Sequence, residues 1–381
     1  MSAQPLAYHT YVIDVRPVHG ARDFRRFLNY PYLRHRRDPH WIPPLRIAER
    51  DRLRPRKNPF FAHADHALLL ARRDGVVCGR IAAFDDRLHN ETHGDNIASF
   101  GFFEAEDADT ARALLGAVEA WAAQRGRTGV RGPLNPSLNE EAGLLVDGFD
   151  TDPMLLMPHN PPEYAAFVEG AGYTKVKDLY AWIYEVAPGP GRTVEKVAAR
   201  FKARERIEIR PLEAREFERQ VDRLRLLYCG AWERNWGFVP PTPAEFRRIA
   251  ADLKLILDPR LAIRAEVDGT MIGCAIALPD INQVLKGTGG RLFPLGLVRL
   301  LMRRRIIDQT RALLLGLLPK YRHSGLYALL WHELHRSAQA AGYRRAELSW
   351  VLEDNDNINH AVENAGARRY KTYRIYQKAL A

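Results

Sequence analysis

One short segment of the chain has the residue types and spacing of an anion-binding loop. An apolar, strand-like run (311–319) is followed by the start of an amphipathic, helix-like run (325–342), and the connection comprises Arg322, His323, Ser324, Gly325, Leu326 and Tyr327. Backbone N–H groups at a helix start can bind an anion, the helix dipole favours negative charge there, and a glycine allows close approach. Arg322 adds a fixed positive charge. The segment therefore predicts a site for a phosphate or pyrophosphate group.

This loop lies in the second of two copies of one sequence pattern. At a single constant offset, the dipeptide at 16–17 recurs at 210–211, the Asp-Gly pair at 74–75 recurs at 268–269, and VEGAG at 168–172 recurs as VENAG at 362–366. Each copy reads as strand, helix, Asp-Gly hairpin, strand, helix, strand, short helix and strand. We predict two α/β folds, residues 1–189 and 190–381, with helices on both faces of each sheet.

The second copy resembles the GNAT superfamily of N-acyltransferases. Its R-H-S-G-L-Y segment stands where that family has [RQ]-x-x-G-x-[GA], between the fourth strand and the third helix, and the segment from Asn355 is similar to the family's N-x-x-A…G-F ending. Tyr327 departs from the small residue of the motif, which narrows the loop or reorients the cofactor. Over both copies, the resemblance implies tandem GNAT folds, each a mixed, mostly antiparallel sheet flanked by helices, with acyl-CoA as donor substrate and no metal.

The resemblance also implies direct attack of an amine on a thioester, assisted by a base, by backbone groups that hold the oxyanion, and by an acid. Leu317 and Leu318 would supply the backbone groups, and Asn355 matches an asparagine that touches the cofactor arm. The family's usual acid, a tyrosine, is replaced by Val362. Tyr327 and His360 lie nearby and are candidate replacement acids. The candidate bases are Glu347, Glu353 and Glu266, and for each of these glutamates a solvated surface position is the alternative.

The first copy lacks the anion-binding loop. Three acidic residues stand in the place of Arg322, His323 and Gly325, and acid there repels a pyrophosphate: Glu106, Asp107 and Asp109. We expect this copy to bind no acyl-CoA and to have a structural or acceptor-binding role. Its Gly/Pro-punctuated segment 131–153 is either an irregular surface loop or a lining of the acceptor pocket, through Asn135, Asn139, Glu140 and Glu141.

An insertion at 280–310 immediately precedes the acyl-CoA strand. It joins a set of large apolar residues (Phe293, Leu295, Leu297, Val298, Leu300, Leu301, Met302, Ile306 and Ile307) to a set of arginines (Arg291, Arg299, Arg303, Arg304 and Arg305). This pattern suits a helix in an anionic membrane interface or a channel for an acyl chain. A core helix with a solvated basic end is the alternative.

Composition limits the partners and the compartment. The 381-residue chain has a formal net charge of +11, which favours anionic partners. Its arginines are dispersed and no aromatic-basic module appears, so we expect no nucleic acid. The start has no secretory pattern and no stretch reaches ~18 apolar residues. We expect a cytosolic protein, peripheral on the inner membrane, that has reduced thiols and no metal, since neither the cysteines nor the pairs His63/His66 and His332/His335 show a complete ligand set.

The layout, including PHWIPPL, KNPFFAHAD and NEEAGLLVDGFD, is similar to a proteobacterial tandem-GNAT group near the bacterial ceramide synthases, which N-acylate a long-chain base. The resemblance implies an acyl-CoA-dependent N-acyltransferase that moves a fatty acyl group to the primary amine of a sphingoid base or another lipid-like acceptor. Two alternatives stay open. One is a Fem-like transferase that uses aminoacyl-tRNA and needs no CoA loop. The other is a non-catalytic acyl-CoA-binding regulatory module, which the missing tyrosine permits.

Overall fold

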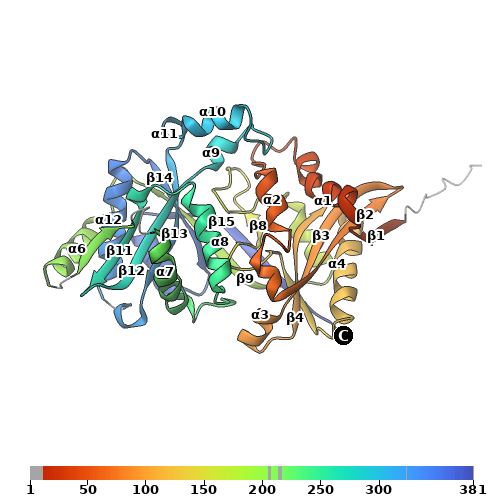
Figure 1. The fold of residues 1–381 in the computed structure, drawn as a ribbon, viewed down its shortest axis with the longest axis horizontal. Helices are drawn as coiled ribbons and strands as arrows, with labels where there is room; N and C mark the ends of the chain where they lie inside the picture. Colours follow the sequence, from red (N-terminus) through yellow and green to blue (C-terminus); the bar gives the residue numbers. More distant parts are fainter. Residues whose placement is uncertain (1–11, 205–206, 213–216, 323, 381) are drawn as a thin grey trace, which may run out of the picture.

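The computed structural model describes residues 12–204, 207–212, 217–322 and 324–380, and shows two halves that share one long sheet (Figure 1). The strands of the first half are β1 (Ile13–Pro17), β2 (Ala64–Arg73), β3 (Val76–Asp86), β4 (Ile97–Ala105), β5 (Gly129–Gly132), β6 (Leu134–Asn135), β7 (Glu141–Ala142), β8 (Leu144–Asp147) and β9 (Thr174–Glu185). Those of the second half are β10 (Glu208–Pro211), β11 (Ala262–Val267), β12 (Thr270–Pro279), β13 (Gln309–Leu317), β14 (Arg345–Leu352) and β15 (Arg368–Ala379).

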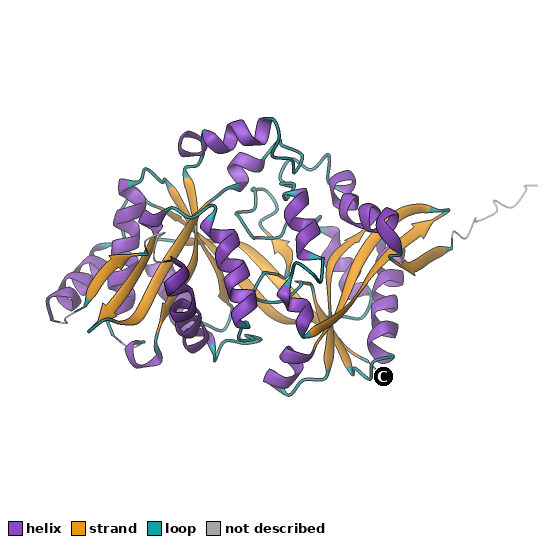
Figure 2. Cartoon of the chain, in the orientation of Figure 1, coloured by secondary structure: helices purple, strands orange, loops and turns teal. Residues whose placement is uncertain are grey.

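Helices lie on both faces of this sheet (Figure 2). In the first half they are α1 (Gly20–Arg34), α2 (Arg46–Arg52), α3 (Arg87–His93), α4 (Ala108–Ala123) and α5 (Glu163–Gly170), with a short 3-10 helix, η1 (Pro59–Ala62). In the second half they are α6 (Arg192–Arg204), α7 (Phe217–Trp232), α8 (Pro243–Lys254), α9 (Asn282–Leu285), α10 (Leu295–Leu301), α11 (Arg303–Ile306), α12 (Leu326–Ala340) and α13 (Asp356–Asn364), with the 3-10 helices η2 (Pro259–Leu261) and η3 (Pro319–Tyr321).

The repeat seen in the sequence is a repeat of backbone geometry. Pro17 pairs with Leu69 between β1 and β2, and the corresponding residues, Pro211 and Ile263, pair between β10 and β11. The two hairpins turn in the same way, because Asp74 and Asp268 have φ values of 51° and 49° and each is followed by a glycine that also has a positive φ. A turn with two left-handed positions requires such residues.

The last strand of each half lies in the other half. The sheet order is β1-β2-β3-β4-β5-β15-β9-β14-β13-β12-β11-β10, with β8 pairing β15 beside this path. β15 of the second half thus pairs with β5 of the first half, and β9 of the first half pairs with β14 of the second. β9 and β15 also pair with each other, with Arg368 opposite Ile183 and Thr174 opposite Gln377. The predicted mixed, mostly antiparallel α/β architecture is confirmed. The predicted division at 189/190 falls between β9 and α6, but the sheet itself continues across the two halves.

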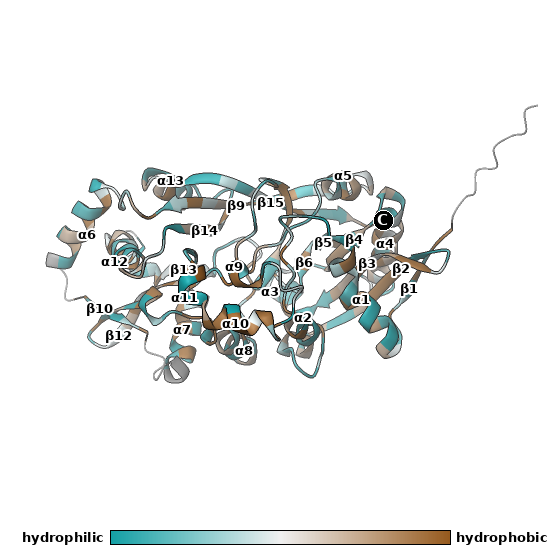
Figure 3. Ribbon diagram, turned by 90° about the horizontal axis from the view of Figure 1, so that it is seen from above, coloured by the Kyte–Doolittle hydropathy of each residue, from teal (hydrophilic) through white to brown (hydrophobic). Residues whose placement is uncertain are grey.

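Alternation along the strands produces a core on each face. Leu69 and Ala71 of β2 join the cluster under α4 and α5, whereas Leu68 and Leu70 join a second cluster with Phe27 of α1. In the second half, α6 and α12 cover one face and α7 covers the other. Seen from above (Figure 3), α5 and α13 lie on one side of the sheet, and α2, α7 and α8 lie on the opposite side.

Candidate functional site

The predicted anion loop connects the end of β13 to the start of α12. After Leu317 the chain forms η3, and Ser324 Oγ then donates to the carbonyl of Tyr321 at 2.6 Å and accepts from the N–H of Leu326 at 3.3 Å. Gly325 is the N-cap of α12 and provides no side-chain cap. Within the described residues, the amides of Tyr327 and Ala328 in the first turn therefore have no side-chain acceptor. His323 lies outside the described residues.

Two helices hold this loop in place. Arg322 Nη2 donates to the carbonyls of Gly230 and Ala231, at 2.9 and 3.1 Å, in the last turn of α7. On the other side, a Cβ at Gly325 would lie 3.0 Å from Cβ of Phe201 on α6. Glycine is thus the residue that lets α6 pack directly against the start of α12. The Arg322 guanidinium remains half-buried, and its other N–H groups are available to an anion.

β13 and β14 separate beside this loop. They pair in parallel from Gln309–Arg345 to Ala312–Leu348, and β13 then continues to Leu317 paired only with β12. The splay leaves one edge of β13 open over residues 313–317. Leu318 donates its N–H to the carbonyl of Ile272 at 3.0 Å and accepts from the N–H of Tyr321 at 2.9 Å, so it has no N–H left for a ligand. Leu318 is therefore wrong as a predicted backbone donor, whereas the role of Leu317, at the end of the open edge, stays a prediction.

A buried polar cluster lies where the two strands are still paired. Glu347 of β14 is fully buried, and its carboxylate accepts hydrogen bonds from the hydroxyls of Tyr370 and Ser349. Arg311, its neighbour on β13, places Nε 3.6 Å from the carboxylate and 2.7 Å from Ser349 Oγ. Burial and the negative charge of Glu347 raise the pKa of Tyr370 far above its ordinary value. The predicted solvated position is therefore wrong for Glu347.

Both halves of the chain contribute to the surroundings of this cluster. Arg311 Nη1 donates to the carbonyl of Leu155 at 2.9 Å, and the N–H of Leu155 donates to Asp280 at 2.9 Å. Burial raises the pKa of Asp280 to about 7 and lowers the pKa of Lys371, which donates to carbonyls of the segment 148–151, to about 8. The Tyr373 hydroxyl is buried without a hydrogen-bond partner. A buried polar group of this kind calls for a ligand or an ordered water.

The other predicted catalytic and cofactor residues are more dispersed. Glu353 makes an ion pair of 2.6 Å with Lys175, and His360 is exposed on α13. Asn355 caps α13 by accepting from the N–H of Ile358. Tyr327 is half-buried in the first turn of α12, where burial raises its pKa. Within the described part of the chain, no hydrogen bond or ion pair joins Tyr327, Glu347, Glu353 and His360 to one another.

Glu266 lies away from solvent as well. It is buried on β11 and accepts from Arg264 at 3.1 Å, so its predicted solvated position is also wrong.

Sequence reasoning missed Arg311, Ser349, Tyr370 and Asp280. The signal available was Arg311, a charged residue at the start of the apolar run of β13, because such a residue requires a partner when its strand is buried.

The first half closes the equivalent positions with its own side chains. Asp107 caps α4 by accepting from the N–H of Thr110 at 2.9 Å. The space beside β4 is filled by β6, because Asn135 Oδ1 accepts from the N–H of Phe102 at 2.6 Å and a Cβ at Gly101 would lie 1.8 Å from the carbonyl of Leu134. At the positions equivalent to the α12 site, the N–H of Thr110 is therefore already taken by a carboxylate, and β6 occupies the space beside β4.

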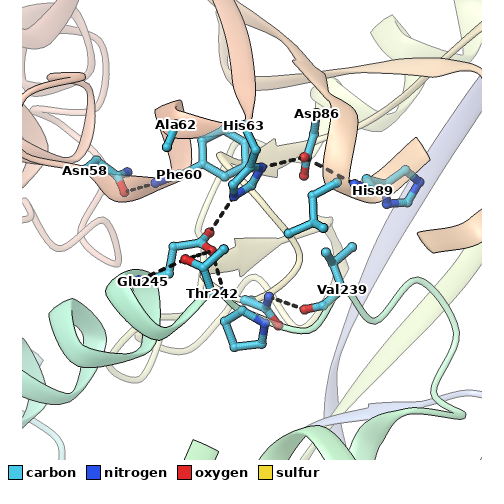
Figure 4. A network of polar contacts seen from close by, with 12 residues as sticks. Asn58, Phe60, Ala62, His63, Asp86, His89, Val239, Thr242 and Glu245 are labelled. Carbon is cyan, nitrogen blue, oxygen red and sulfur yellow. Dashed lines mark hydrogen bonds and ion pairs between the residues drawn. The ribbon is translucent and has the colours of Figure 1, made fainter. Parts of the chain in front are cut away.

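The polar loop predicted to line an acceptor pocket contacts the second half, and its acceptor-binding role stays a prediction. Asn139 donates to the carbonyl of Val239 at 2.8 Å and Glu140 pairs with Arg248 of α8 at 3.0 Å, both across the halves, whereas Glu141 pairs with Arg52 of the first half at 3.0 Å. Beside it, His63 bridges Asp86 of β3 at 2.8 Å and Glu245 of α8 at 3.2 Å (Figure 4).

Within residues 12–204, 207–212, 217–322 and 324–380, no group of three or more His, Cys, Asp or Glu side chains lies close enough together to hold a metal ion. Among the same residues, every helix is too short or too polar to cross a lipid bilayer.

Comparison with known proteins gives consistent matches along the whole chain, although no family model matches the sequence. The bacterial ceramide synthase of Caulobacter vibrioides is 39% identical over 97% of this chain and 98% of its own length. Protein YghO of Escherichia coli is 35% identical over 96% of this chain and 95% of its own length. A tandem GNAT protein from the clavulanic acid biosynthesis pathway is 13% identical and superimposes with a TM-score of 0.59 over 97% of this chain and 98% of that one, which shows the shared fold. The chain thus belongs to the bacterial ceramide synthase family and has a tandem GNAT fold.

Proposed function

We propose that this protein is an acyl-CoA-dependent N-acyltransferase that moves a fatty acyl group to the primary amine of a lipid-like acceptor, such as a sphingoid base. The observation that carries the proposal is the uncapped start of α12 at the end of an open strand edge, beside the buried Glu347 cluster. The family relationship supports the reaction, since one full-length relative is named a ceramide synthase.

The donor fits along β13. The pyrophosphate of acyl-CoA binds the free amides at the start of α12 and the Arg322 guanidinium. The pantetheine arm then lies along the open edge of β13 toward β14. The run from Arg311 to Leu317 spans roughly 20 Å, which an extended pantetheine arm can cover. The thioester is thereby placed near Glu347, at the point where the two strands separate.

The buried cluster supplies the proton transfers. Glu347 takes a proton from the acceptor ammonium, and the free amine attacks the thioester carbonyl to form the amide C–N bond. The C–S bond then breaks, and Tyr370 gives its hydroxyl proton to the leaving CoA thiolate. Tyr370 takes the second proton of the attacking nitrogen in exchange, and Glu347 releases the first proton to solvent, so the products are the amide, the free thiol and one proton. Tyr370 is the proposed donor because it is hydrogen-bonded to Glu347, whereas Tyr327 lies at the pyrophosphate end of the site. General acid–base catalysis of this kind contributes about 10²- to 10⁴-fold to the rate.

The acceptor is proposed from the surroundings of Glu347. Apolar side chains from both halves form one cluster, among them Leu155, Leu278, Ile281 and Leu313, and the carbonyl of Leu155 joins it to Arg311 beside Glu347. An alkyl chain is compatible with such surroundings, whereas a polar amine such as a sugar would leave its hydroxyl groups without partners.

The test is an amine-dependent assay of CoA release. Purified protein is incubated with palmitoyl-CoA and sphinganine, with thiol release and N-acyl product both measured. We expect release only when both substrates are present, and faster with palmitoyl-CoA than with acetyl-CoA. If palmitoyl-CoA raises the Tm but no tested amine causes release of the CoA thiol, the protein is a binding module and the proposed catalytic function is wrong. If no CoA species raises the Tm or is consumed, the donor assignment is wrong and a transfer RNA-dependent reaction is the next to test.

A further inference from the structure

The insertion before β13 forms a short arch of helices at one rim of the molecule. α9, α10 and α11 run across the top of the view in Figure 1, between the two halves. Within the arch, α10 is tied to α9, because Arg299 donates to the carbonyls of Gln283 and Val284, both at 2.8 Å. Leu300, Ile306 and Ile307 point into the core with Ile281 and Val284. The arch is therefore a fixed part of the fold.

The outer face of α10 is apolar and unusually exposed. Phe293 and Leu301 are each 79% exposed and Leu295 is 68% exposed, and Val298 and Met302 continue the same face. Figure 3, which views the arch from above, shows this helix as a largely hydrophobic segment. Isolated exposed apolar residues are normal, but a contiguous group on one helix marks an interaction surface.

Positive charge surrounds this apolar face. Between residues 286 and 307 the sequence contains six basic residues and no acidic one. Arg303, Arg304 and Arg305 are all exposed, and within the described part of the chain no acidic side chain pairs with them. The exposed Ile47 of α2 continues the surface, since Arg46 binds the carbonyls of Gly289 and Gly290.

We propose that this surface, residues 291–305 with Ile47 at its edge, binds an anionic lipid bilayer. Phe293, Leu295 and Leu301 enter the interface, and Arg303–Arg305 contact the headgroups. A second copy of the chain is a poorer occupant, because symmetric docking would bring the two arginine runs together. Leu300 of α10 packs on the apolar cluster that contains Leu155 and Ile281, and the carbonyl of Leu155 accepts from Arg311, the partner of Glu347. A bilayer on this surface would therefore face the same apolar cluster as Glu347, although the binding itself does not depend on the acyl-transfer proposal.

The test is flotation of the full chain with vesicles of phosphatidylcholine alone or with a fraction of phosphatidylglycerol. We expect binding to the anionic vesicles that weakens as salt is raised. Replacing the apolar tips, Phe293→Ser with Leu301→Ser, should weaken binding at least about tenfold. Replacing all three arginines by glutamine should weaken it about 100-fold on anionic vesicles and little on phosphatidylcholine.

A matched control removes exposed apolar residues elsewhere. Val76 and Leu255 are 70% and 75% exposed on other surfaces, and Val76→Ser with Leu255→Ser should leave vesicle binding unchanged. Circular dichroism and Tm establish that each variant is folded. The proposal is overturned if folded wild-type protein does not float with anionic vesicles, if the control loses as much binding as the tip variant, or if light scattering shows a dimer that the tip variant abolishes.

Discussion

The starts of α4 and α12 are the same position in two copies of one fold, but their N–H groups are satisfied differently. At α4, the Asp107 carboxylate accepts from the N–H of Thr110, so a negative charge of the chain itself stands at the helix start. At α12, Gly325 has no side chain, and the neutral Ser324 hydroxyl accepts from the N–H of Leu326. A helix start leaves donors that need an acceptor. The difference is therefore one of charge, and we expect an external anion to be repelled at α4 and accepted at α12.

The two halves also differ in the space beside the strand that precedes each of these helices. β6 fills the space beside β4 through Asn135, whereas β13 and β14 separate after Ala312 and Leu348. Each half also buries a carboxylate, Glu104 or Glu347, with a tyrosine and an arginine beside it. Only Glu347 lies next to an open strand edge. This difference is the reason for proposing that Glu104 stabilises the fold and that Glu347 acts on a substrate.

The largest expected effect comes from Glu347→Gln. The amide keeps the shape of the side chain but removes the proposed base, so kcat should fall about 1,000-fold while the Kd for palmitoyl-CoA changes little. Stopped assays with sphinganine and calorimetric titration of the acyl-CoA measure the two quantities. Tyr370→Phe should lower kcat in the same direction.

The matched control is Glu104→Gln in the first half. Burial disfavours the charge of Glu104, but His35 and Arg80 outweigh it and lower the pKa of this carboxyl. Its loss should therefore reduce the Tm and leave kcat per folded molecule unchanged. Equal losses of kcat in the two variants would contradict the distinction between the buried carboxylates.

The second-largest effect should come from placing an acidic residue at the start of α12, as α4 has one at its own start. Ser324→Asp places a carboxylate at the loop, where it takes up free amides and repels a pyrophosphate. The affinity for palmitoyl-CoA should fall at least about 100-fold, or about 3 kcal/mol. Ser324→Asn is the neutral control and should keep most of the affinity. Unchanged binding by the aspartate variant would place the pyrophosphate elsewhere.

Removing the acid from the first half should have a smaller effect, on stability alone. Asp107→Ala removes the cap of α4 and should lower the free energy of unfolding by about 1–2 kcal/mol. It should create no second CoA site, because β6 still fills the opening beside β4. A Tm measurement and the stoichiometry of CoA binding test both statements. Two bound CoA molecules per chain would show that the acid alone disables the first half.

How well a feature can be predicted from the sequence depends on how far apart in the chain the residues that determine it lie. The hairpins and the start of α12 depend on neighbouring residues, and the repeat is visible as matching residues at one constant offset, so the sequence predicted all three. The exchange of β9 and β15 depends on which of two similar strands pairs with β5, and no local pattern distinguishes them. The cluster around Glu347 was missed because it depends on strand register, which places Arg311 opposite Glu347, and on the position of β15, which brings Tyr370 to the same carboxylate. Arg299 was grouped with the surface arginines, but it binds backbone carbonyls.

The smallest expected effect concerns the contact between the halves, where the copies also differ. His63 bridges Asp86 and Glu245, whereas the corresponding residue of the second copy, Leu257, packs in an apolar cluster. Burial opposes the charge of His63, but its two carboxylate partners outweigh burial and raise the pKa from 6.5 to about 9. The stabilisation is therefore complete below about pH 6.5 and is lost as the pH rises through about 9. His63→Gln should lower stability by about 1 kcal/mol at pH 6 and by less at pH 9.5, measured as urea midpoints, with His66→Gln as control. A deficit that grows with pH would show that His63 is neutral in the folded protein and that the two halves meet through packing alone.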